Sequence, residues 1–583
     1  MLKTLMRYIG EYKKDSIITP IFTALEVFME ILIPFVTAAI IDQGIQGENM
    51  TKVLQFGGIM IILAFASLFF GAAGAAFAAR ASTGFACNLR DGMFVNIQTF
   101  SFANIDKYST AGLVTRMTTD ITNVQNAYQM ILRMAVRAPL SMICSMVMCF
   151  YINVRLSLVF LVALIFLAIV LFSIAGMTMP IFQATFEKYD EVNASVQENV
   201  NGIRVVKAFV REDYEKSKFD NAADRLYKMF VKAEGILAFN NPSMMLVVYG
   251  CIIMLSWFGS HFIVSGTMTT GNLTSLFSYV MSMMMSLMML SMVFVQISMS
   301  LASMRRIAEV LDEKADLVNH EDPIAVVPDG QIDFDHVSFS YRKNAKEDTL
   351  HDIDLHIKSG ETVGIIGGTG SGKSTFASLI SRLYDVNEGS IRIGGIDVRD
   401  YDMSELRKQV AVVLQKNVLF SGTILENLRW GKEDATEEEC IEACRQACAD
   451  EFIEKLPDRY NTWIEQGGTN VSGGQRQRLC IARALMSHPK VLILDDSTSA
   501  VDTATDAKIK QAFAEHIPGT TKLIISQRIS SIERADRILV LDDGKVSGFD
   551  THENLLKNNS IYQEIYQVQV ESGGDFDEPG KED

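Results

Sequence analysis

Residues 491–502, VLILDDSTSAVD, place two acidic side chains directly after an apolar run. Four apolar residues lead into Asp495 and Asp496, a pattern typical of a buried strand that delivers carboxylates to a site at its C-terminal end. A metal ion would account for one carboxylate. The role of the second, on a side chain as short as aspartate, depends on what else the chain carries.

A glycine-rich stretch, GGTGSGKS at 367–374, matches the phosphate-binding loop, with Gly367, Gly372, Lys373 and Ser374 at the required places. Glycines let the backbone curl so that its N–H groups face the phosphates at a helix N-terminus. Lys373 would reach the β and γ phosphates, and the Ser374 hydroxyl would ligate Mg²⁺. An ordinary glycine turn is the alternative, but here an apolar strand precedes the loop and a helix pattern follows it. The residues predicted to contact the nucleotide here are Gly367, Gly368, Thr369, Gly370, Ser371, Gly372, Lys373, Ser374 and Thr375.

The elements before this loop have a different composition. The first 310 residues contain long apolar runs, and a buried soluble core does not need runs of this length. The stretches 53–79 and 156–186 hold no Asp, Glu, Lys or Arg, and 235–304 is free of them over a length that suits two spans. With 17–41 and a segment near 138–152, the sequence predicts a bundle of six transmembrane helices.

Basic residues set the orientation of these spans. The segments 80–137 and 180–234 are rich in Lys and Arg, whereas the intervening turns carry only Lys52 and Arg155. We therefore expect a multi-pass protein of the cytoplasmic (inner) membrane, with both termini and the nucleotide-binding domain in the cytoplasm. The basic segments have helical periodicity, so the spans are expected to continue as long cytoplasmic extensions.

From about residue 330 short strands, glycine turns and charged helices predict an α/β P-loop nucleotide-binding domain. The expected organisation is a transmembrane domain at 1–316, with cytoplasmic loops near 80–137 and 180–234, a linker at 317–330, the nucleotide-binding domain at 331–567 and an acidic, disordered tail at 568–583.

Composition limits the function classes. The chain has 583 residues and a net charge of −16, which argues against nucleic acid as a partner. Its mean hydropathy of +0.18 is high for a soluble protein. Eight cysteines without paired spacing indicate reduced thiols. Cys440, Cys444 and Cys448 share a helical face, for packing or for a metal cluster completed from elsewhere. No cleavable signal peptide is expected, because the first apolar run is too long.

Further motifs carry a family resemblance. VSGGQRQRL at 471–479 is followed by ARAL, VVLQKNVLF surrounds Gln415, and SAVD occupies 499–502. Together with the phosphate loop these resemble the ATP-binding-cassette (ABC) family over the whole chain. Six spans followed by one cassette look like an exporter-type half-transporter with an ABC ATPase domain. Residues 199–212, NVNGIRVVKAFVRE, are similar to the loop that such exporters dock onto a cassette.

The resemblance implies roles for matching residues, with ATP and Mg²⁺ as cofactors. Tyr341 would stack on adenine. Gln415 would touch Mg²⁺ and sense the γ-phosphate, and Asp495 would hold the metal through water, beside Ser374. The signature residues would contact a nucleotide held mainly by an opposite cassette, so a partner subunit is required. The remaining implied nucleotide contacts are Ser472, Gly473, Gly474, Gln475 and Asp502.

Three positions depart from the family pattern. Asp496 stands where the family usually has the glutamate general base, and Gln527 stands where it has a switch histidine. Gln466 replaces a usual glutamate before the signature. A glutamine cannot carry the proton that imidazole can. The chain thus resembles the degenerate-site subunit of heterodimeric bacterial multidrug exporters, with a slow site of its own and an intact signature for its partner's site. A homodimer with two slow sites is the alternative.

The cargo is less defined. A methionine-rich last span fits a surface that repacks around small hydrophobic or amphipathic substrates, or simple helix packing. Its methionines are Met281, Met283, Met284, Met285, Met288, Met289 and Met292. Glu26 and Glu30, one turn apart in the first span, would bind cationic cargo or a proton, or pair with a neighbouring helix. A lipid or lipid-linked flippase and a nucleotide-regulated channel or sensor remain alternative functions.

Overall fold

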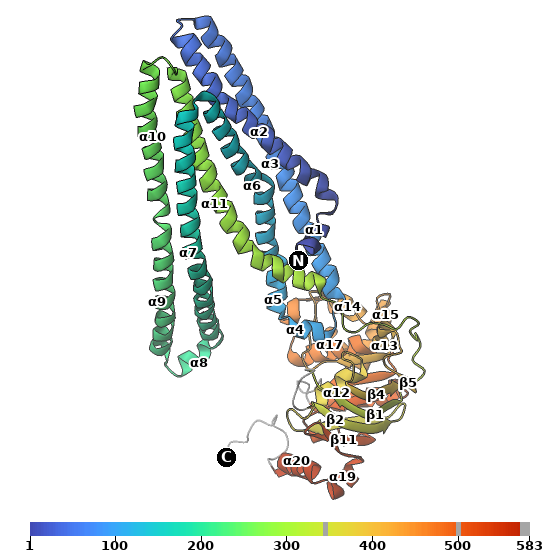
Figure 1. Cartoon of the computed structure of the whole chain (residues 1–583). Coiled ribbons are helices and arrows are strands. Elements are labelled where there is room, and N and C mark those ends of the chain that lie inside the picture. The colour runs from blue at the N-terminus through green and yellow to red at the C-terminus, as the bar shows by residue number, and fades with distance from the viewer. Residues whose placement is uncertain (342–347, 497–502, 572–583) are drawn as a thin grey trace. The chain divides into compact units, whose positions relative to one another are not determined.

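The computed structural model describes residues 1–341, 348–496 and 503–571 (Figure 1). The chain forms two compact units. We call Met1–Thr99 with Tyr108–Glu313 the helical unit, and Phe100–Lys107 with Lys314–Asp583 the sheet unit. Each unit is described by itself. The short segment Phe100–Lys107 belongs to the sheet unit although it lies within the N-terminal half of the sequence, which the sequence did not predict.

The helical unit consists of long helices joined by short turns (Figure 1). Its elements are α1 (Leu2–Arg7), η1 (Gly10–Tyr12), α2 (Lys13–Ala39), η2 (Ile40–Ile45), α3 (Met50–Gln98), α5 (Thr110–Thr115), η3 (Arg116–Asp120), α6 (Ile121–Ile152), α7 (Val154–Asn201), α8 (Ile203–Ala208), α9 (Glu212–Leu237), α10 (Asn240–Val264) and α11 (Thr270–Asp312).

Within the described residues, six helical segments are long and apolar enough to cross a membrane. They are Gly10–Ile45, Met50–Gln98, Thr110–Ile152, Val154–Ile181, Glu212–Val264 and Thr270–Asp312. The predicted number of spans is therefore confirmed. Backbone groups in a lipid core must be satisfied within the segment, which favours such unbroken helices.

Small residues and polar contacts bring α2 and α11 close to their neighbours. A β-carbon on Gly71 of α3 would lie 2.8 Å from Oε1 of Glu26 in α2, so a larger residue there would displace the Glu26 carboxylate. A β-carbon on Gly271 of α11 would lie 2.4 Å from the carbonyl oxygen of Ala38. Asp42, in the π-helical segment η2, accepts a hydrogen bond from the Gly271 N–H at 2.8 Å and thereby caps α11.

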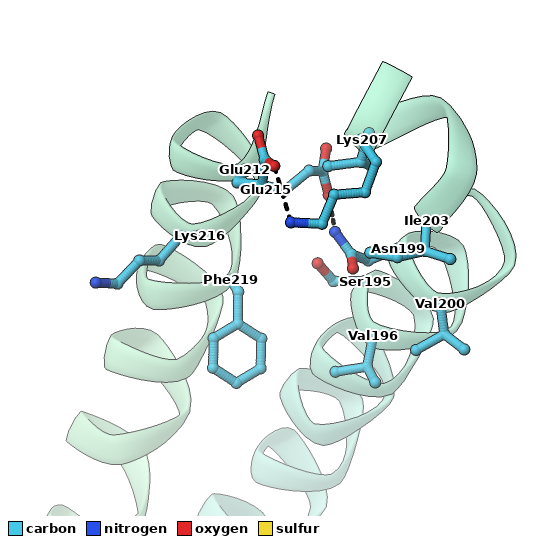
Figure 2. Close-up of a pocket in the computed structure, with 11 residues that line it drawn as sticks. Ser195, Val196, Asn199, Val200, Ile203, Lys207, Glu212, Glu215, Lys216 and Phe219 are labelled. Carbon is cyan, nitrogen blue, oxygen red and sulfur yellow. Dashed lines mark hydrogen bonds and ion pairs between the residues drawn. The ribbon is translucent and has the colours of Figure 1, made fainter. Parts of the chain in front are cut away.

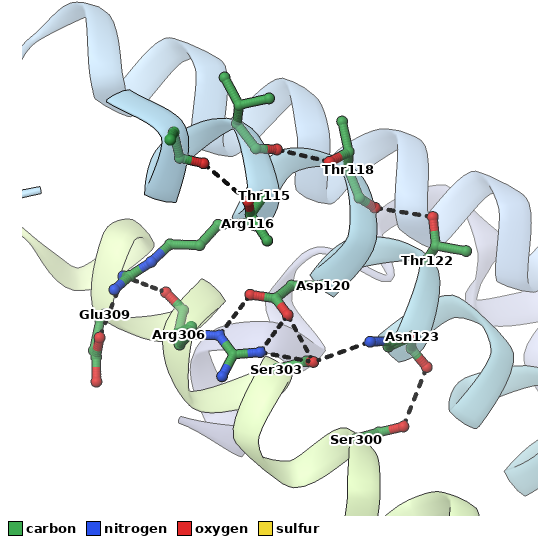
Figure 3. A network of polar contacts seen from close by, with 12 residues as sticks. Thr115, Arg116, Thr118, Asp120, Thr122, Asn123, Ser300, Ser303, Arg306 and Glu309 are labelled. Carbon is green, nitrogen blue, oxygen red and sulfur yellow. Dashed lines mark hydrogen bonds and ion pairs between the residues drawn. The ribbon is translucent and has the colours of Figure 1, made fainter. Parts of the chain in front are cut away.

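A second aspartate joins α11 to the start of α6 at the opposite end of α11. Asp120, in the π-helical segment η3, is 1% exposed and accepts hydrogen bonds from Arg306 Nε (2.7 Å) and Ser303 Oγ (2.8 Å), as Figure 3 shows. Ser300 donates to the Asn123 carbonyl at 3.2 Å in the same network. These contacts, together with the cap at Asp42, tie α11 to its neighbours near both ends.

The sheet unit contains a four-stranded sheet ordered β2-β1-β4-β5, a six-stranded sheet ordered β12-β11-β3-β10-β9-β6 and a small β7-β8 ladder among its described residues. Its strands are β1 (Ile332–Phe339), β2 (Leu350–Ile357), β3 (Thr362–Gly367), β4 (Glu388–Ile393), β5 (Ile396–Asp397), β6 (Val410–Val413), β7 (Gly422–Thr423), β8 (Trp463–Ile464), β9 (Val491–Asp495), β10 (Thr521–Ile525), β11 (Arg537–Asp542) and β12 (Lys545–Asp550).

Helices and short 3₁₀ turns surround these sheets (Figure 1). They are α4 (Phe102–Lys107), α12 (Lys373–Ile380), α13 (Met403–Gln409), α14 (Ile424–Arg429), α15 (Glu437–Gln446), α16 (Asp450–Ile453), η4 (Arg459–Asn461), η5 (Gln466–Gly468), α17 (Gly473–Leu485), α18 (Thr503–His516), η6 (Ile529–Ser531), α19 (His552–Asn558) and α20 (Ser560–Glu571). The last helix continues past residue 567, where the sequence placed the start of the acidic tail.

The six-stranded sheet is covered on both faces, which explains the unbroken apolar strands. Along β9, Leu492 and Leu494 join one core cluster while Val491 and Ile493 join the other. The first cluster includes residues of α15 and α17, and the second includes residues of α12 and the four-stranded sheet. Packing on both faces holds the sheet in place, and the predicted site residues follow the C-terminal ends of its parallel strands.

Candidate functional site

The predicted site residues gather where four neighbouring parallel strands end. In the six-stranded sheet β3, β10 and β9 are adjacent, with Ile365 opposite Ile525 and Ile525 opposite Asp495. β6 pairs with β9 in parallel on the far side. The phosphate loop follows β3, Gln527 follows β10, Asp496 follows β9 and Gln415 follows β6. Ligand sites of open α/β sheets occur at such carboxyl edges.

The loop between β3 and α12 has the backbone shape expected of a phosphate-binding loop. Gly370 and Gly372 have φ values of +86° and +93°, which L side chains rarely adopt. A β-carbon at Gly372 would also lie 2.6 Å from the Leu350 side chain. Lys373 begins α12, and its ammonium donates to the carbonyls of Gly367 (2.9 Å) and Gly368 (2.7 Å). Burial lowers the pKa of Lys373, although Asp495 and Asp496 oppose this shift.

Asp495 and Asp496 occupy different environments although they are adjacent. Asp495 ends a fully buried strand and is hydrogen-bonded by Ser374. Burial and, more weakly, the charge of Asp496 raise the pKa of Asp495, while Ser374 and Lys373 oppose the shift. Asp496 is less buried, and its N–H donates to the Ile525 carbonyl at 2.9 Å.

The amide of Gln415 approaches the second aspartate, with Nε2 3.4 Å from Asp496 Oδ2. Ser374, Gln415 and Asp495 therefore offer a hydroxyl, an amide and a carboxylate along one edge of the sheet. Hard oxygen donors of this kind, with few carboxylates and space for water, suit Mg²⁺. A buried carboxylate with a raised pKa is also stabilised in its charged form by a cation. The residues present fit the metal that the sequence predicts.

Tyr341 lies beside the phosphate loop. Its hydroxyl is 3.0 Å from Thr375 Oγ1 in α12, and its half-exposed ring stands edge-on to Tyr384, with centroids 5.1 Å apart. An exposed aromatic face next to the loop can stack on a base. The structure adds a contact that the sequence missed, because Tyr384 donates a hydrogen bond to Asp106 of α4 at 2.5 Å. Burial, with Asp106, raises the pKa of Tyr384.

The signature residues lie on a separate element of the sheet unit. Ser472 is the N-cap of α17, and its hydroxyl accepts from the Gln475 N–H while the Gln475 side chain accepts from the Ser472 N–H. Ser472 is exposed, and Gly473 and Gly474 form the first helical turn. Gln527 and Gln466 are exposed. Asp502, predicted to touch nucleotide, lies outside the described residues.

The carboxylates of the first span have basic partners that the sequence reading missed. Arg137 of α6 donates to Glu26 and, at 2.8 Å, to both oxygens of Glu30. Arg133 lies 3.9 Å from Glu26. Two arginines one turn apart face two glutamates one turn apart, and this matched i,i+4 spacing was the signal available in the sequence. Of the alternatives for Glu26 and Glu30, the contacts favour pairing with a neighbouring helix.

Cys440, Cys444 and Cys448 were expected either to pack in the core or to join a metal cluster. The described part of the chain holds no group of three or more His, Cys, Asp and Glu residues placed to bind a metal, which favours packing. Cys440 and Cys444 are fully buried in the core, and burial raises the pKa of both thiols. A raised pKa opposes formation of the thiolate that metal binding needs.

Comparisons with known proteins agree with this fold. The family described as "ABC transporter transmembrane region" matches residues 16–314, and the one described as "ABC transporter" matches residues 350–499. The chain is 36% identical over 564 residues to the uncharacterized ABC transporter ATP-binding protein YfiB of Bacillus subtilis (strain 168), covering 97% of this chain and 98% of that protein. It is 34% identical over 458 residues to the ATP-dependent lipid A-core flippase of Desulfotalea psychrophila, covering 78% and 80%.

Among solved structures, a bacterial Atm1-family ABC exporter with ATP bound is similar, with a TM-score of 0.82 and 25% identity, covering 96% of this chain and 99% of that one. Six apolar helices followed by an α/β nucleotide-binding domain define the ABC exporter class. This chain belongs to the ABC transporter family and is a multi-pass membrane protein that couples ATP to transport.

Proposed function

We propose that this chain is the slow-site half of a heterodimeric exporter that moves hydrophobic or amphipathic compounds out across the cytoplasmic membrane. Its termini and nucleotide-binding domain face the cytoplasm. The observation that carries the proposal is a contrast within one cassette. Asp496 and Gln527 stand at the sheet edge in place of stronger catalytic groups, while the signature from Ser472 to Gln475 is complete.

At its own site the chain binds ATP and performs slow hydrolysis. Lys373 holds the β and γ phosphates, and the loop N–H groups bind their oxygens. Ser374, Gln415 and Asp495 would hold Mg²⁺, which would neutralise charge on the phosphates when bound. Asp496 orients and polarises the attacking water, but its carboxylate is one methylene shorter than a glutamate. A displacement of about 1 Å lowers the rate by about a hundredfold.

At the partner's site the chain contributes Ser472, Gly474 and the start of α17. Ser472 is exposed at the N-cap of α17 and the glycines after it are half-buried, so this helix start is accessible to the phosphates of a second nucleotide. Hydrolysis would proceed mainly at that site, on the partner's phosphate loop.

The turn between α7 and α9 is proposed to dock onto the partner's cassette. Here α8 lines a cavity of about 290 Å³ (Figure 2). Among the residues that line it, Lys207 donates a hydrogen bond to Glu212 at 2.9 Å, and Asn199 donates one to Glu215 at 3.1 Å. Val205 and Phe209, on the turn itself, are 61% and 73% exposed. Large apolar side chains at the tip of a rigid helical pair are suited to burial in a protein partner.

For the cargo, the methionines of α11 differ in burial, and Met288 and Met289 are half-buried. Met283 and Met284 are packed, whereas Met281, Met285 and Met292 are exposed in the helical unit. Their spacing of four and seven residues places the exposed group on one face of the helix. Flexible thioethers on one face suit varied apolar ligands. Glu26 and Glu30 are instead paired with Arg137, with Arg133 near Glu26, so they are assigned a structural role.

The second candidate is a lipid or lipid-linked flippase on the same scaffold. It is favoured by the similarity to a protein named as an ATP-dependent lipid A-core flippase. Stimulation of ATPase activity by several unrelated hydrophobic drugs supports the first function, and stimulation by one defined lipid alone supports the second.

The partnership is tested by comparing the purified chain with its complex. Alone in lipid nanodiscs, the chain should bind ATP and hydrolyse it very slowly. Co-expressed with a half-transporter that has glutamate and histidine at the positions of Asp496 and Gln527, it should form a stable complex whose ATPase activity is higher by orders of magnitude. Robust ATPase from the single chain would contradict the proposal, including its homodimeric alternative with two slow sites.

A further inference from the structure

Near the end of α20, the side chain of Gln569 contacts the backbone of the segment that follows β10. Its Nε2 donates to the Gln527 carbonyl at 2.7 Å, and its Oε1 accepts from the Ile529 N–H at 2.9 Å. One primary amide therefore holds both ends of the three-residue segment that carries Gln527. The pairing uses a donor and an acceptor of glutamine at once.

The helix that carries this amide is firmly anchored. Tyr562 is fully buried, and its hydroxyl lies 2.7 Å from Nδ1 of His552. The Asn559 amide donates to the Ser547 carbonyl of β12 at 3.0 Å. Ile565 packs against the same core cluster that contains Ile529. Because these contacts join α20 to the core, it is a fixed reference for the segment and not a mobile tail.

On its other side, the segment is joined to the nucleotide site. The Ser526 N–H donates to the Ile365 carbonyl at 3.1 Å, and the Arg528 N–H donates to Ser526 Oγ at 3.0 Å. The Ile525 carbonyl accepts from the Asp496 N–H. The side chain of Gln527 itself is exposed. The backbone fixes the point from which this side chain extends, and Gln569 is hydrogen-bonded to that backbone.

We propose that Gln569 is a positioning residue that fixes the segment 527–529, so that the Gln527 amide is presented to the γ-phosphate of ATP bound at this chain's own site. The inference rests on the proposed slow site, in which Gln527 takes the place of the family's switch histidine beside the γ-phosphate. Glutamine has more rotatable bonds than histidine, so holding its amide in one place requires a more strictly fixed backbone. Loss of the Gln569 contacts therefore weakens recognition of the γ-phosphate while leaving the remaining nucleotide contacts in place.

The measurement is the preference for AMP-PNP over ADP, both with Mg²⁺, from equilibrium binding to the full chain in nanodiscs. Gln569→Ala should lower this preference by about three- to tenfold, the effect of one or two hydrogen bonds, with the ADP affinity unchanged. Gln569→Met should behave likewise, since it keeps the length of the side chain without its polar groups. Gln563→Ala is the matched control, because Gln563 lies on the same helix and donates instead to the Leu556 carbonyl.

A double-mutant cycle separates positioning from stability. Gln527→Ala should lower the preference as Gln569→Ala does, and the double variant should lower it no further. The inference would be overturned if the losses of preference from the two single substitutions add in the double variant. It would also be overturned if Gln569→Ala lowered the affinities for ADP and AMP-PNP equally. If Gln527→Ala lowers the preference for AMP-PNP and Gln569→Ala does not, the positioning role of Gln569 is refuted while the role of Gln527 stands. If Gln527→Ala itself changes nothing, the proposed role of Gln527 fails and the inference fails with it.

Discussion

The side chain of Asp496 is one methylene shorter than that of glutamate, and the backbone at this position has an unusual conformation. Its φ is +47°, in the left-handed region that aspartate and asparagine adopt more readily than longer side chains. The short side chain is therefore compatible with the turn that follows β9. This conformation is a property of the structure that the sequence did not indicate.

Restoring the glutamate and histidine of the family tests whether Asp496 and Gln527 limit the rate of ATP hydrolysis at the slow site. In the complex with a partner whose signature is intact, Asp496→Glu with Gln527→His should raise ATP hydrolysis at this site by at least tenfold, because the base and the switch both gain reach or charge. Single-turnover hydrolysis on the complex, with the partner's own site inactivated, measures the change. Asp496→Asn with Gln527→His is the control and should give no gain. If the restored variant remains slow, the two residues do not limit the rate.

A second residue-scale prediction concerns the ion pairs of the first span. Arg137→Ala removes the closest cation from Glu26, whose side chain is 8% exposed, and should destabilise the helical unit by about 3 kcal/mol. The change is measured as a lower thermal midpoint from the fluorescence of Trp257, the tryptophan of α10, in a chain whose other two tryptophans carry Trp430→Phe and Trp463→Phe. The neutral double variant Glu26→Gln with Arg137→Gln should recover most of the loss. Arg155→Ala, at an exposed position, is the control and should shift nothing.

At the scale of elements, much of the architecture could be predicted. Charge-free runs indicated the spans, and the glycine loop, its strand and its helix were identified from motif spacing. Other elements were missed for physical reasons. The helix α4 is six residues long and has no strong periodicity, so its place in the sheet unit is revealed by contacts such as those with Tyr384 and Lys314. The π-helical segments η2 and η3 depart from the 3.6-residue period on which the helix pattern depends.

The tie between α6 and α11 gives the prediction at this scale (Figure 3). Arg306→Ala leaves the buried carboxylate of Asp120 without the guanidinium that bonds both of its oxygens, and should destabilise the helical unit by about 2 kcal/mol, because Arg306 itself is 45% exposed. Arg305→Ala removes the same charge from the neighbouring exposed position and should have little effect. Trp257 fluorescence during thermal denaturation measures both. Equal midpoints for the two variants would show that the Arg306–Asp120 pair does not hold the helices together.

At the scale of the whole molecule, the resemblance to ABC exporters implied an incomplete site, in which the phosphate loop and the signature of one cassette would contact different nucleotides. In the structure the loop precedes α12, while Ser472 of the signature caps a different helix, α17. Which chain completes each site could not be predicted, because no residue of this sequence specifies its partner. That question is decided by the effect of each substitution on the complex.

The two sites should respond very differently to substitutions in this one chain. Ser472→Ala or Gly474→Asp should nearly abolish steady-state ATPase of the heterodimer, because both damage the fast site although they lie on this subunit. Asp496→Asn should lower turnover only modestly, since most hydrolysis occurs at the partner's loop. Lys373→Ala should weaken nucleotide retention at the slow site and slow the cycle without stopping it.

The matched control is Ser487→Ala, because Ser487 lies beyond the C-terminal end of α17 and its hydroxyl donates only to the local Ala484 carbonyl among its described contacts. A loss from Asp496→Asn as severe as that from Ser472→Ala would show that Asp496 serves the main hydrolytic site, and would exclude the asymmetric mechanism.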